Sequence, residues 1–437
     1  MGIEITTIVI FGAFFVLLLI GMPVAFCLFS IAILGYLLFA GPHTLFLTVP
    51  VIFRSVTLDI YVALPLFIFM ASVFQVSGIG ERMYTAMYKW FGGLRGGLAI
   101  GTIFMCTIIA AITGLAGTGT ILLGMLAYPE MRKRGYDKSL AIGSILAGGV
   151  LGPIIPPSCP MILIGGLTGV SVGKLFMAGV FTGLLCAALF VAYIGLRSLY
   201  NPSLAPALPK EQRSSWSDKF GSLRGVIAPI LLIIAVLGGI YAGIFTPSEA
   251  GGVGAFGALI CMALYKNLNM RMLTTAVSQT AKTAAMIMWI IMGGYLFSSL
   301  LNTTGVTQFL GGFISGVSAS PNVVLFVMLA ILFVQGMFMD LAPIVFISLP
   351  IMWVASINLG FNPLWFAFIF IFDCIIGMLT PPFGISLFYF KGLGHKDVGM
   401  ENIYKAALPF VPIMIIVLIL CILFPEIVLW LPNTMIR

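Results

Sequence analysis

GPIIPPS at residues 152–158 and GMLTPPFG at residues 377–384 interrupt two long apolar runs of this chain. Both stretches open with glycine and contain a Pro-Pro pair, and the second pair follows the first by 225 positions. Proline removes a backbone donor and breaks a helix, whereas glycine lets the backbone approach a neighbour closely. Two such breaks at matching places in the two halves predict a fold built around interrupted helices.

Composition places these breaks inside a membrane. The 437 residues are 61% hydrophobic and 8% charged, whereas soluble proteins carry about 25% charged residues. Residues 5–53 and 283–339 contain no Asp, Glu, Lys or Arg, and an uncharged run of about 20 residues crosses a bilayer as a helix. The predicted fold class is an all-α polytopic membrane protein. A β-barrel is excluded because these runs are apolar on every side.

The remaining composition argues against nucleic-acid binding and against an enzyme. The formal net charge is +8, but Lys and Arg cluster in a few loops, which is the pattern that sets membrane topology. The seven cysteines lie in apolar stretches without metal-ligand spacing, so we expect them to be buried and free. Both histidines are expected in solvated loops, and no nucleophile–base pair, HExxH motif or P-loop occurs. Residues 5–20 follow no basic region, which favours a retained helix over a cleaved signal.

Four landmarks of the first half recur in the second half at nearly one offset. The pairs are Pro23 and Pro247, Gly78 and Gly305, Gly114 and Gly336, and Pro156 and Pro381, with offsets of 224, 227, 222 and 225. A common offset close to half the chain length predicts two copies of one unit. We count five membrane crossings in each unit, and an odd number means that the second copy is inverted.

The predicted first repeat covers residues 1–200, a cytoplasmic linker covers 201–224, and the second repeat covers 225–437. Each repeat is expected to contain scaffold helices, an arm, a re-entrant hairpin, a broken helix and a closing helix. In that order, the segments are 5–77, 78–97, 98–128, 139–168 and 172–197 in the first repeat, and 225–301, 302–320, 321–356, 363–390 and 405–432 in the second. The scaffold helices are 5–20, 24–40, 60–77, 225–244, 249–265 and 284–301.

The distribution of charge predicts the orientation of the chain. The first arm and the loop after the first hairpin are basic, and their counterparts in the second repeat are uncharged. The basic residues are Arg82, Lys89, Arg95, Arg132, Lys133, Arg134 and Lys138. Cytoplasmic loops are rich in Lys and Arg, so the first hairpin should open inward and the second outward. The 198–224 linker, with Lys210 and Arg213, and the 391–405 loop also fall inside, which places both termini outside. The arm cations should lie at the inner headgroups.

The hairpin tips and the broken helices form the predicted site. The tips are TGLAGTGT at 113–120 and QGMFMD at 335–340. Irregular backbone at membrane depth is tolerated only where it is buried in protein or lines a cavity. Carbonyls at half-helix C-termini suit a cation such as Na⁺, and half-helix N-termini suit an anion. We expect each tip to form a cation site with the break of its own repeat, with an anion between the two sites. The alternative is that Gly and Pro only kink helices for packing.

Four acidic residues lie near or within apolar segments, and intramembrane carboxylates are candidates for ion or proton handling. Glu249 is better explained as a structural cap, because Thr246 and Glu249 flank Pro247 in the pattern of a capping box. Asp340 closes the second tip and is a candidate for a direct or supporting role. Asp59 is a candidate partner for Arg54, and Asp373 is left without a role. No Lys or Arg lies at a tip or break, so an anion would be held by helix dipoles, hydroxyls and bound cations.

At these residues the chain resembles the large membrane subunit of a TRAP (tripartite ATP-independent periplasmic) transporter, over essentially its whole length. The stretches that carry the resemblance are MRKRGYDKSLA (131–141), LGPIIPPSCPMILIG (151–165), LTGVSVGKLFMAG (167–179), FTPSEAGG (245–252), GMFMD (336–340) and MLTPPFGISLF (378–388). The resemblance implies a Na⁺-driven, elevator-type importer of organic acids in the bacterial inner membrane. In that membrane, the outer side given by the charge pattern makes both termini periplasmic. It also implies two partners besides the lipid bilayer, a small four-helix membrane subunit and a periplasmic substrate-binding protein.

The resemblance assigns the first of at least two Na⁺ sites to Thr113, Gly114, Gly117, Thr118, Gly152 and Pro153, and the second to Gly336, Met337, Gly377 and Thr380. Candidate substrate contacts are Thr120, Pro157, Ser158, Asp340 and Pro382. The first tip departs from the family, which has Ser-Gly-Ser where this chain has Thr113-Gly114-Leu115. Residues 117–120, Gly-Thr-Gly-Thr, are candidates for the missing oxygen ligands.

The mechanistic hypothesis is a mobile domain of both hairpins and both broken helices, carried on a scaffold of the paired helices and coupled to it by the two arms. The main rival is a stand-alone ion-coupled anion transporter with the same architecture and no binding protein. A channel is disfavoured because symmetric tips around a midplane site suit alternating access. A membrane enzyme would need a catalytic constellation that the sequence lacks.

Overall fold

The computed structural model describes residues 2–209, 211, 213–265, 269–316 and 320–436, and within these ranges the regular structure is entirely helical. In the first half of the chain the α-helices are α1 (Ile3–Leu19), α2 (Val24–Gly35), α3 (Thr48–Val56), α4 (Ala63–Val76), α5 (Ile79–Phe91), α6 (Gly97–Thr113), α7 (Thr118–Lys133), α8 (Lys138–Gly149), α9 (Cys159–Thr168) and α10 (Val172–Tyr200). In the second half they are α11 (Trp216–Tyr241), α12 (Pro247–Leu264), α13 (Met270–Thr303), α14 (Val306–Gly316), α15 (Pro321–Phe338), α16 (Leu341–Asn358), α17 (Pro363–Leu379), α18 (Ile385–Lys391), α19 (Met400–Ala407), α20 (Val411–Leu423) and α21 (Glu426–Asn433).

The helices present an apolar surface suited to lipid. Among the described residues, eight helices are long and apolar enough to cross a membrane. Large apolar side chains such as Leu19 and Phe326, 87% and 71% exposed, lie on the outside of the molecule. A soluble protein rarely exposes a continuous surface of this kind. The prediction of an all-α polytopic membrane protein is confirmed.

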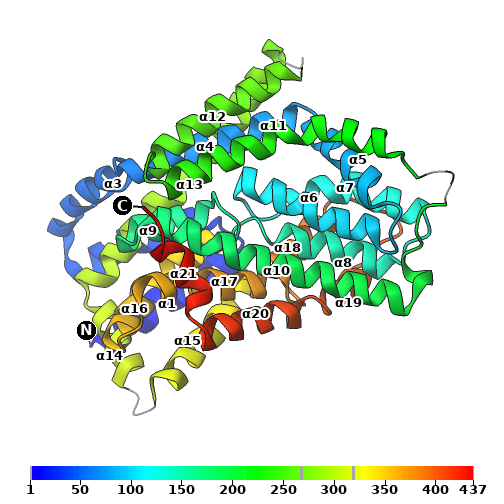
Figure 1. Ribbon diagram of the computed structural model, residues 1–437. Coiled ribbons are helices and arrows are strands. Elements are labelled where there is room, and N and C mark those ends of the chain that lie inside the picture. The colour runs from blue at the N-terminus through cyan, green and yellow to red at the C-terminus, as the bar shows by residue number, and fades with distance from the viewer. Residues whose placement is uncertain (1, 210, 212, 266–268, 317–319, 437) are drawn as a thin grey trace.

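The helices pack in two groups (Figure 1). In the first, α12 packs on α4, α13 packs on α2 and α4, and α11 packs on α5, so helices from both halves of the chain share one layer. In the second, the hairpin α6–α7 packs on α8, and α15 packs on α17. Contacts of α16 with α9 and of α18 with α7 join the two hairpins and breaks into one body.

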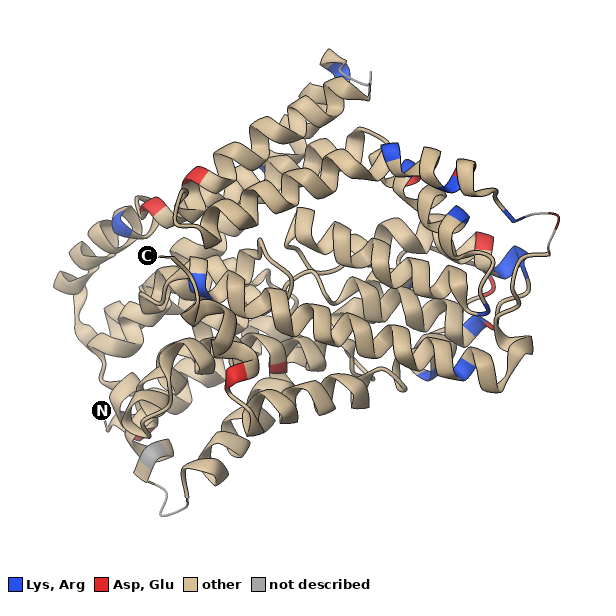
Figure 2. Cartoon of the chain, viewed as in Figure 1, with Lys and Arg blue, Asp and Glu red and all other residues tan. Residues whose placement is uncertain are grey.

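Charge is distributed unevenly along the long axis of the molecule. Figure 2 shows most Lys and Arg at the right-hand end, whereas both chain termini lie toward the opposite end. The basic, right-hand end contains the loops that the sequence predicts to be cytoplasmic. Of their basic residues, Lys210 lies outside the described residues. The inverted repeat and the count of five crossings in each copy stay predictions.

Two boundaries differ from the sequence-based expectation. The predicted linker extends to residue 224, but α11 begins at Trp216, where the Ser215 side chain accepts a hydrogen bond from the backbone of Asp218. The scaffold helix predicted at 284–301 is α13, which begins at Met270 behind the cap Asn269. Both polar extensions are helical because their caps satisfy the first backbone donors, which an apolar pattern does not reveal.

The predicted closing helix 405–432 is wrong as a single helix, because the chain forms α19, α20 and α21 in its place. Pro409, Pro412 and Pro425 stand at the two interruptions, where proline cannot continue the preceding helix. By contrast, α10, the closing helix of the first half, contains no proline and runs unbroken for 29 residues.

Candidate functional site

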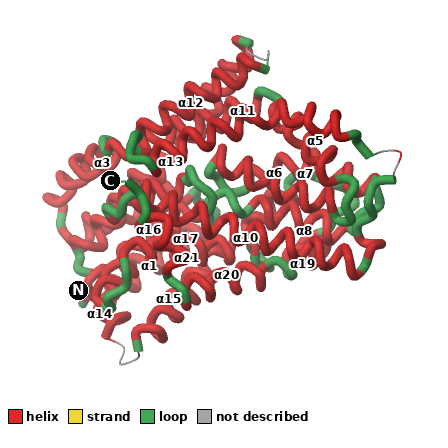
Figure 3. The backbone as a smooth tube through the Cα atoms, in the orientation of Figure 1, coloured by secondary structure: helices red, strands yellow, loops and turns green. Residues whose placement is uncertain are grey.

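The predicted tips and breaks lie in the middle of the helical body, where Figure 3 shows loop segments surrounded by helices. The first tip is the turn at 114–117 between α6 and α7, and the first break is the irregular segment 150–158 between α8 and α9. The second break is the segment 380–384 between α17 and α18. The second tip is shorter than predicted, because α15 continues through Gly336 and Met337 to Phe338 and leaves only residues 339–340 outside a helix.

The backbone of the first tip is in direct contact with the backbone of the first break. Gly114 has a left-handed φ of +59°, and a Cβ atom there would lie 1.9 Å from the carbonyl oxygen of Pro157. A Cβ on Gly152 would lie 2.3 Å from the carbonyl oxygen of Leu115. The backbone N–H of Cys159 donates to the carbonyl of Gly114 at 3.2 Å. Only glycine fits at Gly114 and Gly152, because backbone stands where a side chain would begin.

Two threonine hydroxyls of the first tip are buried without a hydrogen-bond partner. Thr113 and Thr120 are 3% and 0% exposed, and neither Oγ1 atom has a partner. Buried Thr102 and Thr182 instead donate their hydroxyls to the carbonyl four residues earlier. Thr307 of α14, away from the tips and breaks, is a third buried threonine whose hydroxyl has no partner. Buried hydroxyls are nearly always satisfied, so Thr113 and Thr120, which lie at the first tip, are candidates to ligate a cation through oxygen.

A small cavity lies beside Thr113, on the side of the first hairpin that faces α4 and α5. Its volume is about 20 Å³, and its lining is mostly apolar, with Thr113, Thr118 and Gln75 as the polar members. It is large enough for a single water molecule, but no residue of the first break lines it. Thr120 is held over Gly149, where a Cβ would lie only 1.8 Å from the threonine Oγ1.

The second tip packs on the helix that precedes the second break. A Cβ on Gly336 would lie 2.2 Å from the carbonyl oxygen of Cys374, and a Cβ on Gly377 would lie 2.3 Å from that of Phe333. Helices α15 and α17 therefore touch backbone to backbone at this pair of glycines. Thr380 donates its hydroxyl to the carbonyl of Ile376 at 2.7 Å, which leaves its oxygen lone pairs free to accept or to coordinate.

The two halves of the site meet at Tyr389 of α18. A Cβ on Gly117 would lie 2.3 Å from the Tyr389 ring, so α18, the helix after the second break, packs on the first tip. The half-buried carboxylate of Asp340 lies within electrostatic reach of Tyr389 and accepts from the N–H of Leu341 at 2.8 Å. Tyr389 thus contacts the first tip directly and lies within electrostatic reach of the second.

Three of the predicted substrate contacts lie in two different environments, buried at the first break and exposed at the second. Ser158 is fully buried and donates its hydroxyl to the carbonyl of Pro153 at 2.7 Å, so it also closes the first break. Pro157 is buried against Gly114. Pro382 is exposed, and its carbonyl accepts from Tyr404 at 2.8 Å. The second break is therefore open on one side. There the rings of Phe338 and Phe383 stack with their centroids 4.8 Å apart, and both side chains are about half exposed.

The helix N-termini at the site differ in their side-chain caps, and Asp340 caps that of α16. The N-terminus of α7 at Gly117 and that of α9 at Ser158 receive no side-chain cap. Asp137, Ser171 and Asn362 cap the N-termini of α8, α10 and α17, which lie away from the site. An uncapped N-terminus presents free backbone donors and positive dipole ends to an anion.

The remaining acidic residues divide by environment. Thr246 and Glu249 form a reciprocal capping box, with the Thr246 N–H donating to Glu249 at 2.8 Å. The predicted pairing of Asp59 with Arg54 is wrong, because both are exposed and no ion pair joins them in the described part of the chain. Asp373 is buried in α17 with one carboxylate oxygen unpartnered. Within the described ranges, no group of three His, Cys, Asp or Glu residues could hold a metal.

Sequence reasoning missed two residues of the site. Ser386 of α18 is fully buried, and its hydroxyl has no hydrogen-bond partner. Its signal was a lone hydroxyl in an apolar helix directly after the second break. Tyr389 gives no such signal, because its contact with Gly117 joins segments more than 250 residues apart. All seven cysteines are free and buried, as predicted.

Comparison with known proteins gives one consistent family. The family described as "Tripartite ATP-independent periplasmic transporter, DctM component" matches residues 11–427. The C4-dicarboxylate TRAP transporter large permease protein DctM of Pseudomonas aeruginosa is 30% identical over 403 residues, covering 90% of this chain and 93% of that protein. The ectoine/5-hydroxyectoine TRAP transporter large permease protein UehC of Ruegeria pomeroyi is 28% identical, covering 97% and 98%.

Two solved structures share the fold. The Alcanivorax borkumensis YdaH transporter superimposes with a TM-score of 0.64 at 16% identity, covering 90% of this chain and 91% of that one. Neisseria gonorrhoeae MtrF superimposes with a TM-score of 0.65 at 14% identity, covering 90% and 85%. At these identities the likeness concerns the arrangement of the helices alone.

Proposed function

The chain belongs to the DctM-component family of TRAP transporters, and from this premise we propose that it is the permease subunit of a Na⁺-coupled importer of an organic acid. The observation that carries the proposal is the pair of buried, unpartnered hydroxyls of Thr113 and Thr120 at the first tip. An importer of this class is a multi-pass protein of the bacterial inner membrane and catalyses no bond chemistry.

The first Na⁺ site would use Thr113, Thr120 and the carbonyl oxygens that the turn and the first break free. Na⁺ is bound in such transporters by unwound backbone and by half-helix C-termini, and α6 and α8 both end at this place. Leu115, which replaces the serine usual in the family, would be compensated by the hydroxyl of Thr120, five residues further on in the first turn of α7.

The second Na⁺ site would lie at the end of α17, where Gly377 and Thr380 face the last turn of α15. Gly336 and Met337 serve there as helical residues rather than as tip residues, so their contribution is a close approach of backbone. Asp340 would supply negative charge next to the ion without being its main ligand, because its carboxylate already caps α16.

The substrate anion would lie between the two sites, near Tyr389 and the uncapped N-terminus of α7. Curated relatives are named for C4-dicarboxylate, 2,3-diketo-L-gulonate and isethionate, and each of these compounds carries an acidic group. No Lys or Arg lies at a tip or break, so helix dipoles and bound Na⁺ would balance the acid. Coupling follows from this arrangement, because the anion binds well only when the cations are present.

Transport would proceed by an elevator movement of the body that contains both hairpins and both broken helices. The layer formed by α2, α4, α11, α12 and α13 would stay fixed and would bind the small four-helix membrane subunit. Helices α5 and α14, the arms, would link the two parts. A periplasmic binding protein would deliver the substrate on the side where both termini lie.

The Na⁺ assignment is tested on the purified chain. We expect its melting temperature to rise with Na⁺ and to stay constant with equal K⁺ or choline, because ligand binding to the folded state stabilises it. The Thr113→Val/Thr120→Val double variant should lose this rise, whereas Thr102→Val should keep it. An equal rise with K⁺, or an unchanged Na⁺ effect in the double variant, would contradict the site.

A further inference from the structure

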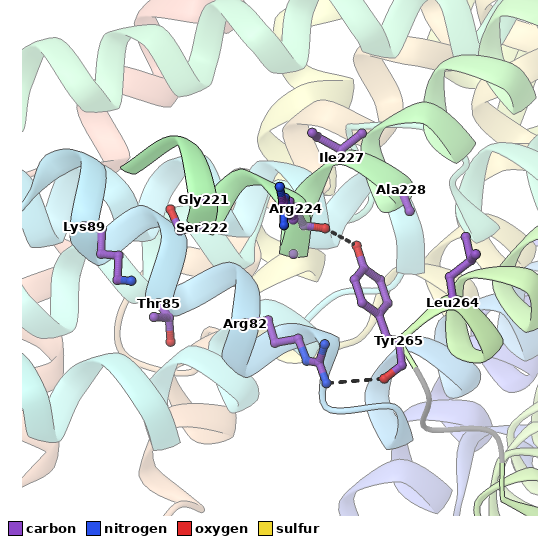
Figure 4. A pocket seen from close by; sticks show the side chains of 11 residues that line it. Arg82, Thr85, Lys89, Gly221, Ser222, Arg224, Ile227, Ala228, Leu264 and Tyr265 are labelled. Carbon is purple, nitrogen blue, oxygen red and sulfur yellow. Dashed lines mark hydrogen bonds between the residues drawn. The ribbon is translucent and has the colours of Figure 1, made fainter. Parts of the chain in front are cut away.

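A basic pocket lies between the arm helix α5 and α11, away from the tips and breaks. Its volume is about 680 Å³, and Tyr265, just after α12, closes one end. Figure 4 shows Arg82, Thr85 and Lys89 on α5, across the pocket from Ser222 and Arg224 on α11. No acidic residue is among those that line it.

Two arginines give this pocket its charge. Arg82 donates to the carbonyl of Tyr265 at 3.4 Å and lies 5.1 Å from the centre of the Tyr265 ring. The Tyr265 hydroxyl donates to the backbone carbonyl of Arg224 at 2.8 Å, so Tyr265 contacts the Arg82 side chain and the Arg224 backbone. None of the ion pairs in the described part of the chain involves Arg82 or Arg224. Lys89 is partly balanced by Asp218.

The rest of the pocket is apolar and faces outward. Ile227 and Ala228 continue α11 beyond Arg224, and Leu264 ends α12 on the far side. Ile227 and Leu264 are 49% and 67% exposed. A soluble phosphate would leave this wall in contact with water, whereas a lipid would cover it with an acyl chain. Cations beside exposed hydrocarbon at the cytoplasmic end of a bundle match the chemistry of an anionic phospholipid.

We propose that the pocket between α5 and α11 binds an anionic phospholipid of the inner leaflet, with its phosphate between Arg82 and Arg224 and an acyl chain along Ile227 and Leu264. The lipid fastens the arm of the first repeat to the first helix of the second. Since α5 is amphipathic, with Arg82 and Lys89 on one side and buried Met83 and Ala86 on the other, the arm needs such an anchor at the membrane surface.

Native mass spectrometry of the purified chain tests the proposal, with phosphatidylglycerol and phosphatidylcholine added in turn. We expect one phosphatidylglycerol to bind at least about tenfold more tightly than phosphatidylcholine, because the arginines recognise net negative charge. Arg82→Gln/Arg224→Gln should remove this preference. The control Arg95→Gln/Arg271→Gln, which loses two exposed cations outside the pocket, should retain it. Equal binding by the pocket variant and the control would overturn the proposal.

A second variant protects the test against misfolding. Ile227→Glu keeps both arginines and adds a negative charge to the apolar wall, and its melting temperature reports whether it folds. With a native melting temperature, it should also lose the bound phosphatidylglycerol. Retention of the lipid would overturn the proposal. Competition by inorganic phosphate at the lipid's own concentration would instead assign the pocket to a free anion, and displacement of the lipid by the small membrane subunit would assign it to a protein interface.

Discussion

At the site, neighbouring backbone leaves no room for a side chain at two glycine positions. At Gly114 the backbone is left-handed and a Cβ would lie 1.9 Å from a carbonyl oxygen; at Gly336 the corresponding distance is 2.2 Å. These contacts place backbone directly against backbone at both glycines. The same glycines were predicted from sequence, because left-handed turns and close approach both select glycine.

Gly114→Ala and Gly336→Ala should abolish transport and leave expression intact. A side chain at Gly114 costs about 1–3 kcal/mol of local strain, which displaces the turn without unfolding the protein, so uptake should fall at least about tenfold. The matched controls are Gly238→Ala and Gly252→Ala, helical glycines with nothing within 4 Å of the added atom. Near-normal uptake in either site variant would count against the ion sites.

Substitution of Thr120 tests whether its hydroxyl is an ion ligand or only a buried hydroxyl without a partner. Thr120→Val removes the oxygen at constant shape, and we expect the Na⁺ concentration for half-maximal uptake to rise about tenfold, equivalent to about 1.4 kcal/mol. Thr120→Ser should restore the wild-type value. If the hydroxyl were only an unsatisfied group, the valine variant would be as active as the wild type and more stable, because a buried unpaired polar group is costly.

At the scale of elements, the sequence predicted the breaks and the first tip because Gly and Pro act locally. The sequence analysis started the second tip too early, at residue 335. Gly336 and Met337 continue α15 as helical residues, and their importance comes from the packing of α15 on α17, which the local sequence does not show. The three-part closing segment was missed because its apolar pattern hid the effect of Pro409 and Pro425. Contacts across the chain, such as Tyr389 on Gly117, leave no local pattern at all.

One such contact fastens the loop after α18 to the first hairpin. Tyr128 of α7 donates to the Asp397 carboxylate at 2.6 Å, and Lys138 of α8 donates to the Asp397 carbonyl at 2.6 Å. His395, expected in solvent, instead contacts the carbonyl of Gly124 at 3.0 Å. This cluster joins elements of both halves of the chain, so we expect it to make the mobile body move as one.

The cluster predicts a pH dependence of stability. The hydrogen bond from Tyr128 is the largest of the effects that lower the pKa of Asp397 below its ordinary 3.8; a backbone hydrogen bond and the charge of Lys138 add smaller effects in the same direction. Its stabilising effect is therefore present above pH 3.8 and is lost as the pH falls through the lowered value. Tyr128→Phe should reduce the melting temperature at pH 7 by about 1–3 °C, and the deficit should shrink below pH 4.

The control for this experiment is Tyr404→Phe, which removes a hydrogen bond of 2.8 Å to the carbonyl of Pro382, a group that does not titrate. Its deficit in melting temperature should stay constant over the same pH range. A Tyr128→Phe deficit that is equally constant would contradict the role of the Asp397 carboxylate.

At the scale of the whole molecule, the charge gradient predicts the orientation in the membrane. Lys and Arg gather at the end opposite to the two termini (Figure 2), and the basic end should be cytoplasmic. Alkaline phosphatase fused after Thr434 should therefore be active, and the same enzyme inserted after Pro206 should be inactive. An active enzyme after Pro206 and an inactive one after Thr434 would contradict this orientation. The first hairpin would then open to the periplasm and the second to the cytoplasm, and the proposed direction of transport would be reversed.

The most direct measurement of the central claim is uptake of a radiolabelled C4-dicarboxylate into proteoliposomes under an imposed Na⁺ gradient. The chain is reconstituted with the small membrane subunit and supplied with the binding protein, and each component is then omitted in turn. The account predicts uptake only when Na⁺, the binding protein and the small subunit are all present. Uptake by this chain alone, or equal uptake driven by K⁺, would contradict it.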